Sequence, residues 1–231
     1  MSVQGIFYRE VLFLTGINIY NCDIDITVVL IYHMITGVMY ESFFTYLKKF
    51  SSEPLTEEEK EIFTRGFMPF KLRKRQYFLQ AGDECRNFAF ITKGAMKRYS
   101  VDSKGVEHID MLAVEDWWMG DRESFVMSTP SIYYIDACED TEMLLISRVD
   151  SLEFRTMPIW CEMVRQLDQN NNVASQNRIM ASISLSAENR YLDFVAHYPK
   201  FEARFPQHLI ASYLGITKDT LSRIKRKILS R

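Results

Sequence analysis

The chain has 231 residues, of which 47% are hydrophobic and 25% charged, and its formal net charge is −2. This length allows one large or two small domains, and this composition is typical of an ordinary soluble protein rather than a disordered or fibrous one. The four cysteines and four histidines are scattered, without any CxxC, HxH or HExxH motif. We therefore expect no metal site of the usual spacing, and we expect reduced cysteines in a cytosolic protein.

Residues 1–38 fit poorly with the rest of the chain. Residues 26–40 form a run of 15 uncharged residues, ITVVLIYHMITGVMY, which is shorter than the roughly 20 needed to cross a bilayer. The segment also lacks the basic start and the cleavage site of a signal peptide, so no membrane association is expected. We interpret residues 1–38 either as an appended β-rich extension or as upstream sequence included by a wrong choice of start. Met39 then opens an amphipathic helical pattern, MYESFFTYLKKF.

A second helix is predicted from Thr56, in TEEEKEIFTRGF. Thr56 and Glu59 have the spacing of a capping box, in which each side chain bonds the other residue's backbone N–H. Ile62 and Phe63 give this helix an apolar inward face. The two N-terminal helices are expected to precede the main domain as a lid.

Between residues 67 and 147 the pattern changes to short runs rich in β-branched and aromatic residues. Turn signals such as Gly82, Gly94 and Gly105 separate these runs. Their regular spacing predicts a closed or rolled antiparallel sheet rather than a βαβ unit. The runs are QYFLQ, FAFITKG, MKRYSV, VEHIDMLAV, YYIDAC and EMLLIS.

One long helix is predicted over residues 159–183, which contain no glycine or proline, after a short helix that ends at Pro158. A seven-residue repeat runs along it and indicates the seam of a homodimer, with small alanines for close approach and an asparagine that fixes register. The alternative is a stripe that packs only on the chain's own sheet. The seam positions are Trp160, Val164, Leu167, Asn171, Ala174, Arg178 and Ala181.

A further helix is predicted over residues 185–198. Ser186 can supply its N-cap, and Arg190 is interpreted as a structural residue that braces the helix against its neighbours. The inward face is expected to hold Leu192, Phe194 and Val195.

Residues 205–231 predict two short helices joined by a tight turn. Gly215 ends the first helix, because only glycine enters the left-handed C′ conformation without a steric cost. Thr217 then caps the second helix, which runs to about residue 229. The apolar face of the second helix is Leu221, Ile224, Ile228 and Leu229.

The polar face of that last helix is strongly basic. Residues 218–231 contain six basic residues and one acid, a net charge of +5, in a chain whose total is −2. A helix–turn–helix places its second helix in the major groove of DNA, and such a charge suits phosphates. The alternative is a solvated helix whose charges favour its negative dipole end. Base edges are expected to meet Lys218, Asp219 and Arg223, phosphates to meet Thr217, Thr220 and Ser222, and Lys225, Arg226 and Lys227 to supply charge.

From about Met39 the chain resembles a Crp/Fnr-type transcription regulator with a cyclic-nucleotide-binding-like β-roll. The resemblance implies an α+β fold: an antiparallel roll that acts as a sensor, a long dimerisation helix and a small helix–turn–helix domain. It also implies a homodimer on palindromic double-stranded DNA, with RNA polymerase as a further partner. The implied boundaries are 39–150, 151–183 and 184–231. The matching motifs are QAGD at 80–83, FITKG at 90–94, WWMGDRESF at 117–125, YIDACEDTEMLLI at 134–146 and LIASYLGITKDTLSRI at 209–224.

The resemblance further implies a phosphate cassette. Gly120 and Asp121 match the family's Gly-Glu pair, and Ser131 aligns with its Ser or Thr, but the arginine that neutralises the phosphate is missing. A buried phosphate without its cation carries a desolvation penalty of several kcal/mol. Cyclic AMP is therefore not the expected effector, no cofactor is implied, and the sequence names no other ligand. The candidate effector positions are Gly120, Asp121, Arg122, Ser131, Ser175 and Gln176.

Two functions compete with a non-enzymatic DNA-binding regulator. One is a sensor module that dimerises and signals through protein contacts, without specific DNA binding. The other is a cupin-like enzyme, which would need a cluster of histidines and a glutamate to hold its metal. His108 is the single histidine within the predicted roll, so the enzyme is the weakest alternative.

Overall fold

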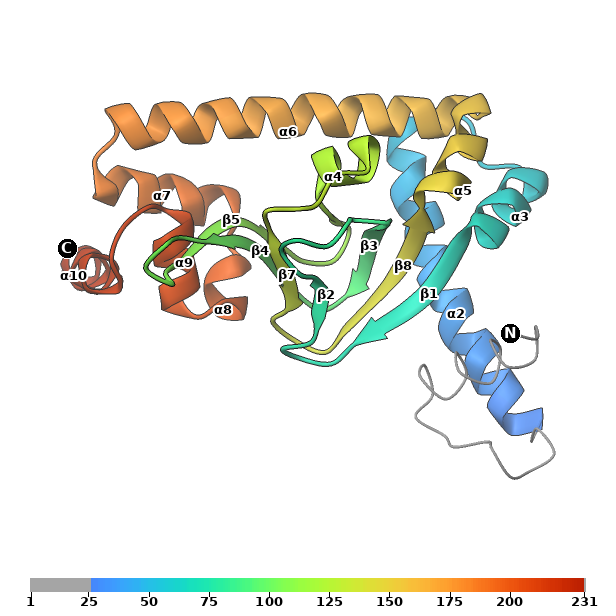
Figure 1. The fold of residues 1–231 in the computed structure, drawn as a ribbon, viewed down its shortest axis with the longest axis horizontal. Coiled ribbons are helices and arrows are strands. Elements are labelled where there is room, and N and C mark those ends of the chain that lie inside the picture. Colours follow the sequence, from blue (N-terminus) through green and yellow to red (C-terminus); the bar gives the residue numbers. More distant parts are fainter. Residues whose placement is uncertain (1–25, 231) are drawn as a thin grey trace. The chain divides into compact units, whose positions relative to one another are not determined.

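The computed structural model describes residues 26–230 (Figure 1), so most of the predicted extension, residues 1–25, lies outside the described residues. Its contacts divide the chain into two compact units. The first contains the chain up to Met96 together with Ala113–Cys161, and the second contains Lys97–Leu112 together with Glu162–Arg231. These units differ from the expected boundaries, because a segment of the predicted sensor, residues 97–112, groups with the C-terminal helices.

The N-terminal helix α2 (Ile26–Leu47) begins well before the expected start at Met39. Residues 26–38 are therefore helical, and the expectation of a β-rich extension is wrong for this part. In the predicted part of the helix, Met39, Phe43 and Leu47 lie four residues apart and are buried, and α2 contacts β3 and β8.

The helix α3 (Glu57–Gly66) has the predicted capping box. Thr56 Oγ1 accepts the backbone N–H of Glu59 at 3.2 Å, and Glu59 Oε2 accepts the backbone N–H of Thr56 at 2.8 Å. The 3-10 turn η1 (Lys48–Phe50) directly follows α2.

Within residues 26–230, eight strands form two four-stranded sheets, with the orders β1-β8-β3-β6 and β2-β7-β4-β5. The pairs β1–β8, β3–β8, β3–β6 and β2–β7 are antiparallel, as predicted for a roll. All six predicted runs are strands, whereas β1 and β6 were not predicted individually. The strands are β1 (Phe67–Leu72), β2 (Tyr77–Leu79), β3 (Asn87–Lys93), β4 (Met96–Val101), β5 (Glu107–Ala113), β6 (Trp118–Met119), β7 (Tyr134–Ala137) and β8 (Thr141–Ser147).

An aromatic cluster forms the core of the first unit. Phe43 on α2 lies 4.6 Å from Phe67 on β1, measured between ring centroids. Phe154 lies 4.9 Å from Phe63 and 5.1 Å from Trp160. Such contacts hold the N-terminal helices to the sheet, since aromatic side chains contribute large buried areas and favourable ring geometry.

The helices after the roll follow the predicted order. Ser186 caps α7 as predicted, accepting the backbone N–H of Asn189 at 3.2 Å. Phe194 is buried with Tyr191, but Leu192 is 43% exposed, so its predicted inward position is wrong. The helices are α4 (Arg122–Met127), α5 (Arg148–Glu153) with the 3-10 turn η2 (Phe154–Thr156), α6 (Pro158–Ser184), α7 (Ala187–His197), α8 (Phe201–Arg204), α9 (Gln207–Tyr213) and α10 (Lys218–Leu229).

Candidate nucleic-acid interface and sensor cassette

The helices α9 and α10 meet through the turn that the sequence predicts. Gly215 has a φ of 67°, the left-handed conformation that glycine adopts freely. The N–H of Ile216 donates to the carbonyl of Ala211 at 3.0 Å, which satisfies a carbonyl at the end of α9. Thr217 Oγ1 accepts the N–H of Thr220 at 3.2 Å and so caps α10.

The apolar face of α10 is largely as predicted. Leu221 and Ile224 are buried, as are Leu209 and Ile210 of α9, and α10 packs against α9. Leu229 is 85% exposed, so its predicted place on the buried face is wrong. It is the last residue of the helix.

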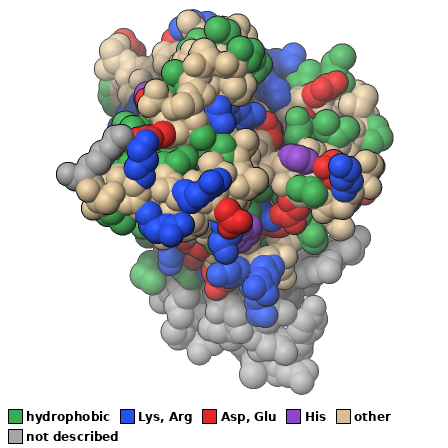
Figure 2. Space-filling model, turned by 90° about the vertical axis from the view of Figure 1, so that its left-hand side faces the viewer, with side chains coloured by type: hydrophobic (Ala, Val, Ile, Leu, Met, Phe, Trp, Pro, Cys, Tyr) green, Lys and Arg blue, Asp and Glu red, His purple; other side chains and the backbone are tan. Residues whose placement is uncertain are grey.

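The opposite face of α10 is exposed and polar. Lys218, Asp219, Arg223 and Arg226 are all exposed, and among the described residues no ion pair joins the three basic side chains to a carboxylate. Figure 2 shows Lys and Arg side chains spread over the face that carries the C-terminal helices. The three residues predicted to meet base edges therefore share an open surface, within two turns of the helix N-terminus.

Two of the predicted charge donors are engaged in ion pairs. Lys225 Nζ lies 2.6 Å from Glu202 Oε1, and the lysine side chain is only 25% exposed. Lys227 Nζ lies 2.6 Å from Glu188 on α7. The lysine bond and a hydrogen bond from Tyr191 lower the pKa of Glu202. Of the three residues predicted to supply charge, Lys225 and Lys227 are thus paired with carboxylates of this chain, and Lys225 links α10 to α8.

The hydroxyl groups expected near phosphates make hydrogen bonds within α10 and its N-cap. Thr217 Oγ1 and Thr220 Oγ1 lie 2.9 Å apart at the helix N-terminus, and Ser222 Oγ donates to the carbonyl of Lys218 at 3.0 Å. All three lie on or beside the exposed face. A phosphate oxygen only accepts, so Ser222 would have to give up its bond to Lys218 to donate to one, whereas the Thr217–Thr220 contact uses one of its two hydroxyl hydrogens.

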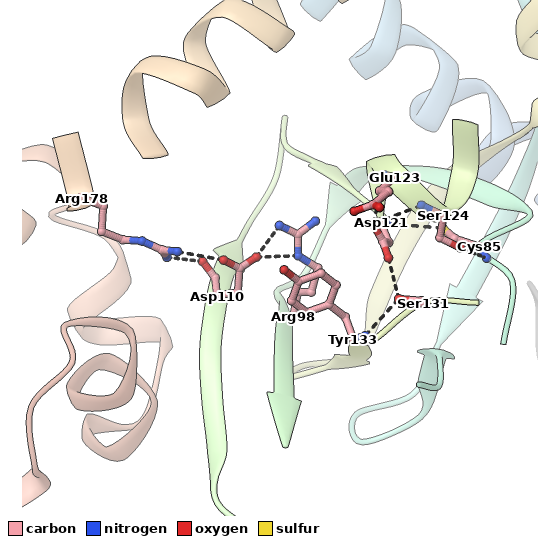
Figure 3. Close-up of polar contacts among 9 residues, drawn as sticks. All are labelled: Cys85, Arg98, Asp110, Asp121, Glu123, Ser124, Ser131, Tyr133 and Arg178. Atoms are coloured by element: carbon pink, nitrogen blue, oxygen red, sulfur yellow. Dashed lines mark hydrogen bonds and ion pairs between the residues drawn. The ribbon is translucent and has the colours of Figure 1, made fainter. Parts of the chain in front are cut away.

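The sensor cassette is closed by its own hydrogen bonds (Figure 3). Asp121 is only 6% exposed, and its Oδ2 accepts the hydroxyl of Ser131 at 2.7 Å. Its Oδ1 accepts the N–H groups of Glu123 and Ser124 at 3.1 and 3.4 Å, which makes Asp121 the N-cap of α4. The structure thus brings Asp121 and Ser131 together, but it pairs them with each other rather than leaving them open to a ligand.

Neighbouring residues fix this arrangement. Ser124 Oγ donates to the carbonyl of Thr129 at 2.6 Å and accepts the N–H of Cys85 at 2.8 Å. An added Cβ on Gly120 would lie 2.5 Å from the ring of Phe88, so glycine is required there by close packing. Sequence reasoning missed Ser124 and Cys85, although an aspartate followed by a polar helical turn is a recognisable N-cap signal.

Arg122 lies outside the cassette, because it is exposed on α4. Asp121 itself is buried. Ser175 and Gln176 are exposed on α6 and belong to the second unit, whereas the cassette belongs to the first.

The predicted seam on α6 needs two corrections. Trp160 is only 6% exposed and packs in the aromatic cluster of the first unit, at 5.1 Å from Phe154. Arg178 is bound within its own chain, where its Nη2 lies 2.8 Å from Asp110 Oδ1. These two residues therefore belong to the chain's own packing. The other five positions, Val164, Leu167, Asn171, Ala174 and Ala181, are partly or fully exposed.

A different face of α6 carries large exposed apolar side chains. Val173, Ile179, Met180 and Ile183 are 50%, 58%, 59% and 74% exposed, respectively. We name these four residues the α6 stripe. At 3.6 residues per turn, it lies on the side of the helix away from the predicted seam.

Comparison with known proteins agrees with this architecture. Residues 69–156 match the family model of the cyclic nucleotide-binding domain. The regulatory protein HlyX of Actinobacillus pleuropneumoniae is 27% identical over 168 residues, covering 66% of this chain and 68% of that protein. The structure of FixK2 from Bradyrhizobium japonicum has a TM-score of 0.57 at 17% identity, covering 71% of this chain and 85% of that one. A Crp/Fnr-family regulator from Eubacterium rectale has a TM-score of 0.58 at 16% identity, with 76% and 84% covered.

The chain thus contains a cyclic nucleotide-binding-type domain, and it is similar in sequence and fold to Crp/Fnr-type regulators. The predicted resemblance to these regulators and the predicted α+β fold are therefore confirmed. None of the helices within residues 26–230 combines the length and the hydropathy that crossing a lipid bilayer requires. Over the same residues, no group of three or more His, Cys, Asp or Glu side chains has the arrangement of a metal site.

Proposed function

We propose that this chain is a transcription regulator that binds double-stranded DNA through α10. The observation that carries the proposal is the division of α10 into two faces. Leu221 and Ile224 are buried against α9, while Lys218, Arg223 and Arg226 are exposed and free of carboxylate partners among the described residues. A helix held in this way by a capped helix–turn–helix can enter the major groove with its N-terminal residues first.

Three side chains near the start of α10 would read bases. Arg223 and Lys218 can donate to the O6 and N7 atoms of guanine, and Asp219 can accept from the N4 amino group of cytosine. Arg226 would lie one turn further along and contact phosphate. Because Lys225 is paired with Glu202, it would hold α10 in place rather than contact DNA.

The active species would be a homodimer on a palindromic site, with RNA polymerase as a further partner. The α6 stripe supports the dimer, because four large apolar side chains on one exposed helix are an unfavourable surface for a monomer. Val173 and Met180 are seven residues apart. Gln176 and Ile183 are also seven residues apart, and each lies three residues after a member of the first pair. This is the a/d spacing of a coiled-coil seam. A two-fold seam would give two recognition helices, and hence two half-sites about one helical turn of DNA apart.

The effector of the roll would not be a cyclic nucleotide. Asp121 and Ser131, which align with ligand-binding positions of the family cassette, bond each other at 2.7 Å, and Asp121 also caps α4. A ribose hydroxyl would have to displace these bonds, and no cassette arginine would compensate the phosphate. Calorimetry with cyclic AMP and cyclic GMP should therefore give no binding heat at micromolar concentrations, and micromolar affinity would refute this part of the proposal.

The DNA experiment is selection of bound sites from random duplexes, followed by affinity measurement against salt. The selected sites should contain inverted repeats, and log Kd should rise linearly with log salt. Arg223→Ala should cost about 1–3 kcal/mol and relax preference at one base pair of each half-site. Arg73→Ala, which removes the same charge from an exposed turn of the roll, should change neither property.

Two outcomes would overturn the assignment. Selection that yields no common sequence would favour the alternative of a sensor that acts through protein contacts. Equal loss of affinity on all duplexes with Arg223→Ala would reassign this residue from base reading to phosphate binding.

A further inference from the structure

The strand β5 ends its sheet and meets the helix α9. Its place in the order β2-β7-β4-β5 leaves one row of its backbone groups without a neighbouring strand. Ser212 on α9 supplies two of the missing bonds. Its Oγ accepts the N–H of Ile109 at 3.0 Å and donates to the carbonyl of Glu107 at 3.0 Å. One hydroxyl thus replaces the donor and the acceptor of an absent strand residue.

A second contact lies one residue further along β5 (Figure 3). Asp110 accepts a hydrogen bond from Arg98 Nε on β4 at 2.8 Å and another from Arg178 Nη2 on α6 at 2.8 Å. Arg178 Nη1 also donates to the backbone carbonyl of Asp110. The guanidinium of Arg178 lies over the ring of Tyr213, 5.3 Å from its centroid, and Tyr213 is the α9 residue next to Ser212.

All these residues belong to the second compact unit. The hairpin of β4 and β5, residues 97–112, therefore contacts α9 through Ser212 and α6 through Arg178. The helix α9 in turn packs against α10, and Leu209 on α9 and Leu221 on α10 are both buried. A continuous set of short contacts thus leads from the hairpin to the recognition helix.

The electrostatics of the cluster favour a fixed geometry. Burial alone would raise the pKa of the Asp110 carboxyl, but the charges and hydrogen bonds of Arg98 and Arg178 outweigh it and hold that pKa below its ordinary value. The side chains of Asp110 and Arg98 are 24% and 20% exposed, so solvent screens the pair only in part. Two arginines on one partly buried carboxylate give a directional contact rather than a loose surface pair.

We infer that Ser212, Arg178 and Asp110 are positioning residues for DNA recognition: they hold α9, and with it α10, at a fixed place on the β4–β5 hairpin. This inference rests on the proposed function. Because the contacts leave Lys218, Arg223 and Arg226 exposed, they orient the recognition helix without covering it. A movement of the hairpin would then be transmitted to α10 through Ser212 and Arg178.

The first experiment measures the contact itself without DNA. Amide hydrogen exchange of Ile109 in the full chain should accelerate about tenfold in Ser212→Ala, because the acceptor of this N–H is lost. Ser212→Thr, which keeps the hydroxyl, should retain most of the protection. The matched control is Ser182→Ala, whose hydroxyl bonds only within α6. Unchanged exchange of Ile109 in Ser212→Ala would overturn the inference.

The second experiment tests the consequence for DNA. The wild-type dimer should prefer one separation of its half-sites, and Ser212→Ala or Arg178→Met should reduce that preference at least about fivefold. A merely structural role would weaken binding equally at every separation. Wild-type protein that ignores separation would refute the proposed function. Variants that keep the full preference of the wild type would refute the positioning role alone.

Discussion

Replacing Asp121 by alanine tests whether its carboxylate has a structural role or a ligand-binding role. In the structure the carboxylate is nearly fully buried and accepts three hydrogen bonds, one from Ser131 and two from the start of α4. A ligand-binding carboxylate would lack such partners in the ligand-free protein, and its removal would be neutral or stabilising. The sign of the stability change therefore reports on the function of the cassette.

The expected loss is about 3 kcal/mol. Removing a helix N-cap costs about 1 kcal/mol, and a hydrogen bond to a charged acceptor contributes about 1.5–3 kcal/mol. The hydroxyl of Ser131 would remain buried without its acceptor, which adds to the loss. For a chain of this size, such a change lowers Tm by about 6–12 °C.

The assay is urea denaturation monitored by tryptophan fluorescence, because Trp117, Trp118 and Trp160 all lie in the first unit and report on the roll. The matched control is Glu123→Ala, which removes an exposed carboxylate two residues further along, in the first turn of α4. The control should change the free energy of unfolding by no more than about 0.5 kcal/mol. A similarly small change for Asp121→Ala would refute the structural role and reopen the cassette as a ligand site.

Three further predictions follow from single residues. Met180→Asp should dissociate the dimer in analytical ultracentrifugation, whereas Asn171→Asp, on the other side of α6, should not; the reverse result would restore the predicted seam. Gly215→Ala should destabilise the helix–turn–helix by about 1–2 kcal/mol in thermal melts, because its φ of 67° is strained for a residue with a Cβ, and an unchanged Tm would contradict this. The lowered pKa of Asp110 means that its stabilising ion pairs are complete above the ordinary carboxylate pKa and weaken only as pH falls through the lower folded value. The amide hydrogen exchange rate of Ile109, corrected for the pH dependence of intrinsic exchange, should therefore be constant between pH 5 and 8. A transition in that range would refute the assignment.

Local signals explain why the helix–turn–helix could be predicted in detail. Gly215 and Thr217 fix the turn through their own backbone and hydroxyl chemistry, and Ser186 and Thr56 fix helix starts in the same way. Each acts on neighbours within about four residues, so the sequence contains the whole interaction. The strand runs were equally visible, because β-branched and aromatic residues lie between clear turn signals.

Features that depend on distant residues could not be predicted. Trp160 matched the seven-residue repeat of α6, yet it packs with Phe154 and other aromatic residues of the first unit. Arg178 matched the same repeat, but it is bound to Asp110, which lies 68 residues away in the sequence. A periodic pattern identifies a face of a helix but not the partner of that face.

The closed cassette and the internal contacts of Arg178 bear on where an effector could act on this protein. Asp121 and Ser131 bond each other, so the cassette itself offers no open partner for a phosphate. The contacts that hold α9 instead come from the β4–β5 hairpin, through Ser212 and Arg178. A ligand shifts an equilibrium only through different affinity for two states. Under the proposed function, we therefore expect an effector to act through those contacts or through the proposed dimer seam. Any signal that leaves the hairpin and the α6 stripe unchanged should therefore leave DNA affinity unchanged.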